Sequence, residues 1–362
     1  MAKKKDKPKY YNFFDDVAKY PDAVIYIVMS HRGPGKTFSF LDGCPKRNEK
    51  FIYMKRTIED VLTVCSGDEV ADINPYKPVN NLNGWKVKPK IINKRGIGYF
   101  ADYNQLDSND NPHFLGYIAA MNAVKTIRGT DFSDASYQCL DEFVPTIGDI
   151  TVKHLEGEQL LDTYMSFNRR REDAGLDPLK LVLFSNTEDI MCPITSTLEV
   201  VDMISDMIAR GDAYCYDEDR HIMIHHLTSK EYPVSKATQK GMYSAMKGTA
   251  WAAKAFEGGF VNNDFSNVVE KNIQHSRCIM HIIYQKKNIY CYENQDNGAL
   301  YFCYKPHQCR NTYDFSKDAD KLRYLHFENA YVRSCIMNDK AKFQTYTMYD
   351  LCLNFMKKFH LR

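Results

Sequence analysis

Short, continuous apolar runs recur along the first half of the chain, separated by polar segments with helical spacing. Four of them span residues 23–29, 51–54, 137–140 and 181–184. Runs without polar alternation are typical of strands that are buried on both faces of a parallel sheet. Residues 155–172 instead place apolar side chains on one helical face and predict a helix. The pattern therefore predicts an α/β domain with a mainly parallel, doubly wound sheet.

The segment 75–112 breaks this pattern into short alternating runs between Gly, Asn and Pro residues, and it predicts a hairpin inserted into the α/β domain. Its basic residues are Lys86, Lys88, Lys90, Lys94 and Arg95. Alternation along a strand places the first three on one side. Two interpretations stay open: an ordinary solvated hairpin face, or a surface that contacts DNA phosphates.

The pattern changes again after Pro193. Residues 195–209 are helical in pattern, and 228–247 have the composition of a linker. From about Trp251 the chain is rich in strand patterns, with a three-strand meander between Cys278 and Tyr304 and helical stretches after it. We therefore predict a first, α/β domain over 1–205, a linker over 206–250 and a smaller α+β domain over 251–362.

Composition limits the expected binding surfaces, the state of the cysteines and the presence of a membrane span, but it does not identify a partner. The 362 residues carry 48 Lys and Arg against 46 Asp and Glu, a net charge of +2, so any nucleic-acid surface must be local. The 11 cysteines include no C-x-x-C pair, which favours reduced thiols over a disulfide scaffold. No apolar run reaches the ~20 residues that a membrane span needs.

The first apolar run leads into a candidate phosphate-binding loop. The loop consists of Ser30, His31, Arg32, Gly33, Pro34, Gly35, Lys36 and Thr37, which approximates G-x-x-x-x-G-K-[ST] between a strand and a helix. In this motif backbone N–H groups cradle the phosphates of ATP, the lysine reaches the β/γ oxygens and the Thr hydroxyl binds Mg²⁺. The alternative is a Gly-Pro turn with an incidental lysine.

Polar residues end two later apolar runs. Asp141 and Glu142 follow the run 137–140, and Asn186 follows 181–184. Ligands of parallel sheets gather outside the carboxyl ends of the strands. We therefore interpret Asp141 as part of the Mg²⁺ site, Glu142 as the residue that activates water and Asn186 as a sensor of the γ-phosphate. A solvated strand end is the competing interpretation of the two carboxylates.

The predicted helix over 155–172 ends in Arg169, Arg170 and Arg171. Such a run usually forms a solvated helix end that complements the helix dipole. In an ATPase that works across a subunit boundary, one of the three can instead reach the γ-phosphate of a neighbouring subunit.

Taken together, the loop 30–37, the strand 51–56, Asp141-Glu142-Phe143 and Phe184-Ser185-Asn186 resemble the DNA-packaging ATPases of phi-29-like tailed phages. The resemblance implies an additional-strand P-loop ATPase domain, related to terminase large subunits, and a ribonuclease-H-like C-terminal domain without nuclease activity. It also implies a homo-oligomeric ring, expected as a pentamer, at the portal or connector of a procapsid. The ring would drive double-stranded DNA inward in the host cytoplasm, with or without a structural RNA.

By the same resemblance, Lys36 and Thr37 correspond to the Walker A pair, Asp141 to the Walker B aspartate, Glu142 to the catalytic glutamate and Asn186 to the coupling residue. Ser30 stands where the first glycine belongs. The arginine run departs from the F-R-N-R pattern of the family, so the three arginines stay alternatives.

Two other functions are compatible with the sequence. One is a terminase with an active C-terminal nuclease, which needs carboxylates that converge from adjacent strands; here the acids lie in turns and loops. The other is a non-catalytic module in which ATP only controls assembly.

Overall fold

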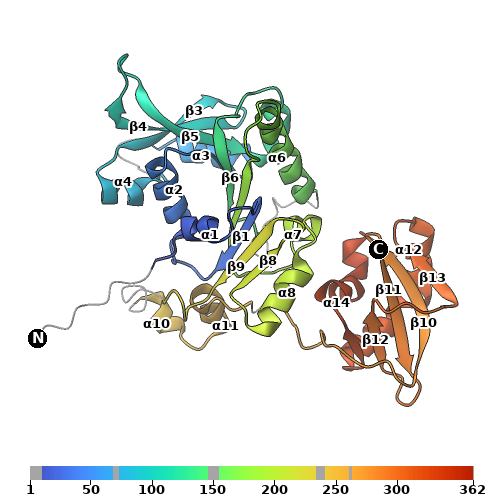
Figure 1. Cartoon of the computed structure of the whole chain (residues 1–362). Coiled ribbons are helices and arrows are strands. Elements are labelled where there is room, and N and C mark those ends of the chain that lie inside the picture. Colours follow the sequence, from blue (N-terminus) through green and yellow to red (C-terminus); the bar gives the residue numbers. More distant parts are fainter. Residues whose placement is uncertain (1–9, 68–72, 146–154, 234–240, 261–262, 362) are drawn as a thin grey trace, which may run out of the picture. The chain divides into compact units, whose positions relative to one another are not determined.

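The computed structural model describes residues 10–67, 73–145, 155–233, 241–260 and 263–361. The chain divides into two compact units, the first from Met1–Glu199 and Arg210–Asn262, the second from Val200–Ala209 and Asn263–Arg362. Each unit contains one sheet (Figure 1). No described helix is long and apolar enough to cross a membrane.

The first unit is built on a nine-stranded sheet with the order β3-β4-β5-β2-β6-β7-β1-β9-β8. Neighbouring strands from β5 to β9 in this order are parallel, and antiparallel pairs form both edges. The predicted α/β class with a large, mainly parallel sheet is therefore confirmed. The strands are β1 (Ile25–Ser30), β2 (Lys50–Lys55), β3 (Val87–Asn93), β4 (Ile97–Leu106), β5 (Pro112–Ala120), β6 (Ala135–Asp141), β7 (Lys180–Asn186), β8 (Tyr214–Asp217) and β9 (Ile222–Leu227).

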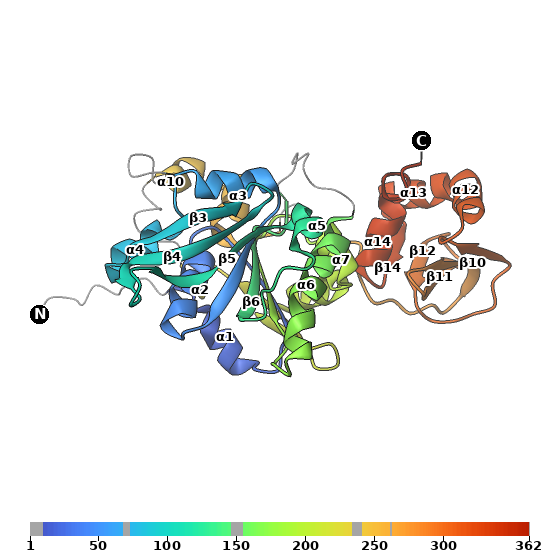
Figure 2. The ribbon, with the colours of Figure 1, turned by 90° about the horizontal axis from the view of Figure 1, so that it is seen from above.

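Helices cover both faces of this sheet, which explains why its inner strands are apolar throughout. Helix α2 and helix α6 lie on opposite sides of β6 (Figures 1 and 2). The helices of this unit are α1 (Phe13–Lys19), α2 (Lys36–Lys46), α3 (Ile58–Cys65), α4 (Lys77–Asn83), η1 (Met121–Ala123), α5 (Val124–Ile127), α6 (Glu156–Asp173), α7 (Pro193–Thr197), α10 (Met242–Met246), α11 (Ala250–Ala252) and the π-helical η2 (Ala253–Glu257).

The structure differs from the pattern-based expectation in the range 206–250, which was predicted as a linker. Strands β8 and β9 lie within this range, and β9 pairs with β1 and with the edge strand β8. The polar pair His225 and His226 interrupts the apolar run there, so the pattern missed the strand. Helix α2 passes through Gly43, where a side chain would overlap the ring of Phe14, so glycine lets α1 and α2 pack closely here.

Buried polar contacts hold β9 to the N-terminal helix. Asp16 on α1 is 1% exposed and His225 is fully buried, and the His225 Nδ1 lies 2.8 Å from the Asp16 Oδ2. The same carboxylate accepts hydrogen bonds from the hydroxyls of Tyr11 (2.7 Å) and Tyr214 (3.3 Å). Buried polar groups of this kind stabilise a fold only while every partner is present.

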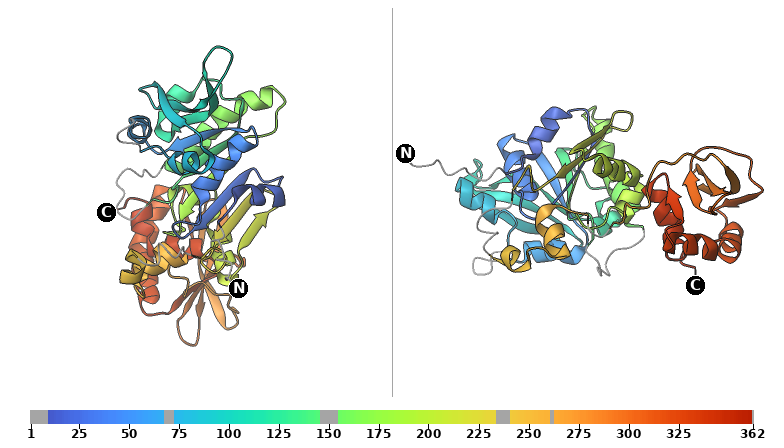
Figure 3. Two further views of the ribbon diagram at one scale, coloured as in Figure 1. Left: turned by 90° about the vertical axis from the view of Figure 1, so that its left-hand side faces the viewer. Right: turned by 90° about the horizontal axis from the view of Figure 1, so that it is seen from below.

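The second unit contains a five-stranded sheet with the order β13-β10-β11-β12-β14. The strands are β10 (Ser276–Tyr284), β11 (Lys287–Asn294), β12 (Leu300–Cys303), β13 (Asn311–Asp314) and β14 (Ala341–Phe343). The predicted meander corresponds to β10, β11 and β12 and is confirmed. The helices are α8 (Val201–Arg210), α12 (Asp318–Phe327), α13 (Asn329–Met337), α14 (Tyr346–Leu353) and α15 (Phe355–Lys358), so this unit is α+β (Figure 3).

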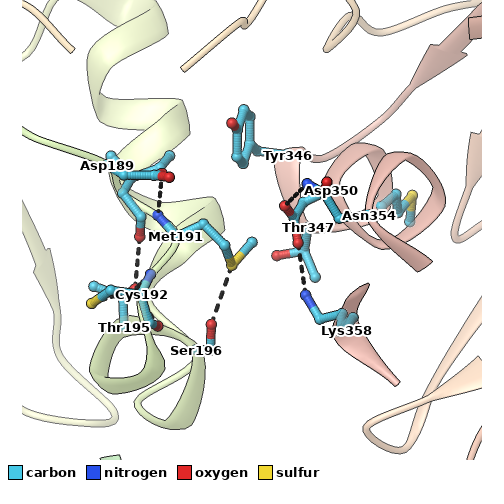
Figure 4. A network of polar contacts seen from close by, with 12 residues as sticks. Asp189, Met191, Cys192, Thr195, Ser196, Tyr346, Thr347, Asp350, Asn354 and Lys358 are labelled. Carbon is cyan, nitrogen blue, oxygen red and sulfur yellow. Dashed lines mark hydrogen bonds and ion pairs between the residues drawn. The ribbon is translucent and has the colours of Figure 1, made fainter. Parts of the chain in front are cut away.

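Specific contacts join elements of the second unit that are far apart in the sequence. Asp202 of α8 accepts a hydrogen bond from the backbone N–H of Thr347 at the start of α14 (2.9 Å). Asp350 of α14 accepts from Asn354 and from Lys358 of α15, as Figure 4 shows. The expectation of reduced thiols throughout is wrong at one place: Cys278 and Cys309 form a disulfide, because their Cα atoms lie only 5.6 Å apart.

Replacing Asp16 by Ala should destabilise the first unit. The substitution leaves His225 and two tyrosine hydroxyls buried without their shared acceptor, a loss on the order of 3 kcal/mol in the free energy of unfolding. Urea denaturation measures this difference. The exposed neighbour Asp15 is the matched control, and Asp15→Ala should cost under about 1 kcal/mol. Equal effects of the two substitutions would show that the Asp16 contacts do not hold α1 to β9.

Candidate active site

The candidate site lies where β1, β6 and β7 end side by side. These strands are parallel neighbours, with Ser30 paired to Asn186 and Asp141 paired to Phe184. Their carboxyl ends therefore open on the same edge of the sheet, which is where ligands of open α/β sheets bind.

The loop between β1 and α2 has the backbone that a phosphate cradle requires. Gly33 and Gly35 adopt φ values of +92° and +101°, in the left-handed region that a side chain disfavours. Gly35 is the N-cap of α2, so the N-terminus of an eleven-residue helix points toward the loop. Helix N-termini stabilise phosphate charge through their free N–H groups and dipole.

Lys36 is buried at the start of α2, and its Nζ donates a hydrogen bond to the Ser30 Oγ. Burial lowers the pKa of Lys36 to about 8, while the carboxylates of Asp141 and Glu142 act in the opposite direction. An anionic phosphate at this position would favour the charged lysine in the same way. Ser30, which replaces the first glycine of the motif, thus supplies an acceptor for the lysine.

Thr37 and Asp141 provide oxygen ligands that fit a hard divalent cation. The Thr37 Oγ1 donates a hydrogen bond to the Asp141 Oδ2 at 2.7 Å, although the residues are 104 positions apart in the sequence. Hydroxyl and carboxylate oxygens are typical Mg²⁺ ligands in phosphate-loop enzymes. These two residues would hold the ion, and the ion would neutralise charge on the phosphates.

Glu142 follows Asp141 in a constrained backbone conformation. Its φ of +58° lies in the left-handed region, which is costly for a residue with a side chain. Arg56 holds this turn by donating to the backbone oxygens of Glu142 (3.2 Å) and Phe143 (2.9 Å), and its guanidinium also pairs with the buried Glu156 of α6. Such strain is typical of functional sites.

A cavity of about 270 Å³ brings the predicted residues together. It is lined by Arg32, Gly33, Pro34, Gly35, Lys36, Thr37, Phe38, Asp141, Glu142, Ser185 and Asn186. Ser30 and His31 of the loop lie beneath it, at most 1% exposed. Burial and the nearby Lys36 lower the pKa of His31 to about 4, so this imidazole is neutral at neutral pH.

The three arginines on α6 do not line this cavity. Arg171 is buried and donates to the backbone oxygens of Ser133, Ala135 and Asp177. Arg169 and Arg170 are exposed and line a separate pocket of about 950 Å³ on the same unit.

The basic hairpin residues fall into two groups. Lys86, Lys88 and Lys90 line a groove of about 560 Å³ along β3. Lys94 and Arg95 are exposed in the turn between β3 and β4.

The acids of the second unit do not converge. Glu293 pairs with Arg277, Asp320 with Arg323 and Asp318 with Lys321. Across the residues that the structure describes, no three His, Cys, Asp or Glu side chains are grouped to hold a metal ion.

The sequence interpretation missed two residues of the site, Tyr53 and Arg56 of the strand β2 region. The Tyr53 hydroxyl donates to the Asp141 Oδ2 at 3.1 Å. A usable signal was present: Tyr53 lies near the end of the apolar run 51–54 and Arg56 follows it, and neighbouring parallel strands end at the same edge.

Comparisons with known proteins support the fold. No protein-family model matches this sequence, and no curated protein does. A solved structure of the bacteriophage Phi-29 viral genome packaging motor assembly matches with a TM-score of 0.64 and 15% identity, over 98% of this chain and 100% of the other. The Phi-28 gp11 DNA packaging motor matches with a TM-score of 0.57 and 13% identity, over 98% and 99%. The chain therefore has the fold of these packaging motor proteins.

Proposed function

We propose that this chain is an ATP-hydrolysing motor that moves double-stranded DNA into a phage procapsid. The observation that carries the proposal is the cavity in which the phosphate loop, Asp141, Glu142 and Asn186 meet. The fold shared with two packaging motors supports the same function. We extend the proposal to a homo-oligomeric ring, expected as a pentamer, at the portal of the procapsid in the host cytoplasm, with a structural RNA as a further possible component.

Each residue of the site has a defined task in hydrolysis. The α2 N-terminus and Lys36 bind the phosphates of ATP, and Thr37 and Asp141 hold Mg²⁺. Glu142 orients the attacking water and accepts its proton, since a carboxylate within reach of the γ-phosphate is the available base. Asn186, on the adjoining strand tip, hydrogen-bonds the γ-phosphate or the water.

Replacing Glu142 by Gln should stop hydrolysis and keep ATP binding. The amide retains the size of the side chain and cannot accept the proton, so we expect kcat to fall by roughly 10²- to 10⁴-fold. Turnover assays and binding of a fluorescent ATP analogue measure the two effects. Glu158→Gln, an exposed position on α6, is the control. DNA translocation that survives without hydrolysis would instead favour the assembly module.

Arg169 is the best candidate for the arginine that acts on a neighbouring subunit. Arg171 is committed to three backbone oxygens, and Arg170 contacts Asp131 at 3.5 Å and the Gly129 oxygen at 3.4 Å. Arg169 is exposed and has no hydrogen bond or ion pair with any residue the structure describes. A guanidinium that must reach another subunit has to be free within its own.

Mixing two inactive variants tests action in trans. Lys36→Ala disables the phosphate loop and keeps Arg169, while Arg169→Ala keeps the loop and lacks the arginine. Each variant alone should lose most ATPase activity, because an arginine of this kind contributes about 10³- to 10⁵-fold. An equimolar mixture should regain activity, since some sites then combine an intact loop with an intact arginine. Arg170→Ala is the matched control, and a mixture as inactive as its components would contradict the assignment.

DNA gripping would be electrostatic and independent of base sequence. The net charge of the chain is only +2, so the contacts must come from a local cluster. The groove residues Lys86, Lys88 and Lys90 and the turn residues Lys94 and Arg95 are the candidates.

Two double variants separate these groups. Lys86→Gln with Lys90→Gln neutralises the groove, and Lys94→Gln with Arg95→Gln neutralises the turn. The variant that removes phosphate contacts should weaken duplex binding and reduce the slope of log K against log salt concentration by about 0.9 per contact. Lys50→Gln is the control, because Lys50 pairs with Asp134. Unchanged slopes for both variants would place the DNA contacts elsewhere.

Among the residues that the structure describes, no carboxylate cluster favours the alternative of a cutting terminase. Glu293, Asp318 and Asp320 pair with basic side chains, whereas a two-metal nuclease needs a shared carboxylate site.

A further inference from the structure

A buried tyrosine lies directly behind the proposed metal ligands. Tyr53 on β2 is 2% exposed, and its hydroxyl donates to the Asp141 Oδ2 at 3.1 Å. The same oxygen accepts the Thr37 hydroxyl at 2.7 Å. Strand β2 pairs with β6 so that Tyr53 lies opposite Cys139, two residues before Asp141, which ends β6.

We propose that Tyr53 is a positioning residue for the divalent cation, and that it acts by fixing the orientation of the Asp141 carboxylate. This inference rests on the proposed function, because it assumes that Thr37 and Asp141 bind Mg²⁺ together. Residues that orient a metal ligand commonly change metal affinity by 10- to 100-fold when they are removed.

Asp141 needs such support because of its place in the chain. It is the last residue of β6, and the next residue, Glu142, has a left-handed backbone. The Asp141 Oδ1 accepts the backbone N–H of Glu142 at 3.1 Å, and Thr37 is itself a candidate ligand. Tyr53 is therefore the side chain that orients Asp141 without belonging to the strand tip or binding the ion.

A tyrosine suits this role chemically. The Tyr53 hydroxyl is an uncharged group that donates its proton in the hydrogen bond to the Asp141 carboxylate. A cationic donor at this position would repel Mg²⁺, and a second carboxylate would compete for it. The ring is held against Phe100, with centroids 6.1 Å apart.

Tyr53→Phe removes only the hydroxyl and tests the proposal. The matched control is Tyr117→Phe, because the Tyr117 hydroxyl donates to Asp134 at 3.0 Å in the same sheet and Tyr117 does not line the site. Calorimetry with a non-hydrolysable ATP analogue measures how much Mg²⁺ each variant needs, and Mn²⁺ binding is followed by electron paramagnetic resonance. We expect the Tyr53→Phe variant to need a Mg²⁺ concentration at least about tenfold higher for the same nucleotide binding. Its kcat should largely recover at saturating Mg²⁺.

A double variant distinguishes positioning from a general loss of structure. If Tyr53 acts through Asp141, the double variant Tyr53→Phe with Asp141→Asn should need the same Mg²⁺ concentration as the single variant Asp141→Asn. A metal requirement of Tyr53→Phe equal to that of Tyr117→Phe overturns the inference, and so does an undiminished effect in the Asp141→Asn background. If the unmodified protein itself binds the nucleotide without any dependence on Mg²⁺, the proposed function fails instead.

Discussion

The hydrogen bond between Thr37 and Asp141 depends on the parallel order of β6, β7 and β1. Thr37 begins the helix after β1, and Asp141 ends β6, with β7 between the two strands. An antiparallel insertion or a shift in register by one residue would carry the carboxylate away from the loop or to the other face. The apolar strands are thus required for the site as well as for the core, because their register fixes where the polar residues at their carboxyl ends lie.

The site combines several arrangements that are unfavourable for folding by themselves. Lys36 is buried with a lowered pKa, and Glu142 has a left-handed backbone. Both are compensated locally: Ser30 accepts from the lysine, and Arg56 holds the backbone oxygen of Glu142. The phosphates of ATP would add negative charge that favours the protonated lysine, so the proposed ligand relieves a cost that the folded chain already carries.

The sequence predicted the loop, the carboxylate pair and Asn186 because each interrupts an otherwise apolar run at a strand end. It did not predict the support around them. Tyr53 lies near the end of the run 51–54 and Arg56 just after it, and only the pairing of β2 with β6 shows that they reach Asp141 and Glu142. Strand β9 was missed for a related reason: His225 breaks the apolar pattern, and its partner Asp16 lies 209 residues away. Long-range polar pairs leave no local signature in a single sequence.

The position of the arginines limits what the cavity of a single chain can supply for hydrolysis. The described residues that line the cavity include the candidate phosphate loop, the proposed metal ligands, a candidate base and a single arginine, Arg32 of the loop itself. The backbone N–H of Arg32 donates to the oxygen of Ala255, which fixes that part of the loop from outside the cavity (2.9 Å). Arg171 is occupied within the fold, and Arg169 has no hydrogen bond or ion pair with any residue that the structure describes. A proposed ATPase site whose described lining has one arginine, on a unit that presents another arginine without a described partner at its surface, is the arrangement expected when hydrolysis requires a neighbouring subunit. Fast hydrolysis would then depend on ring assembly, since isolated chains would bind ATP and hydrolyse it slowly.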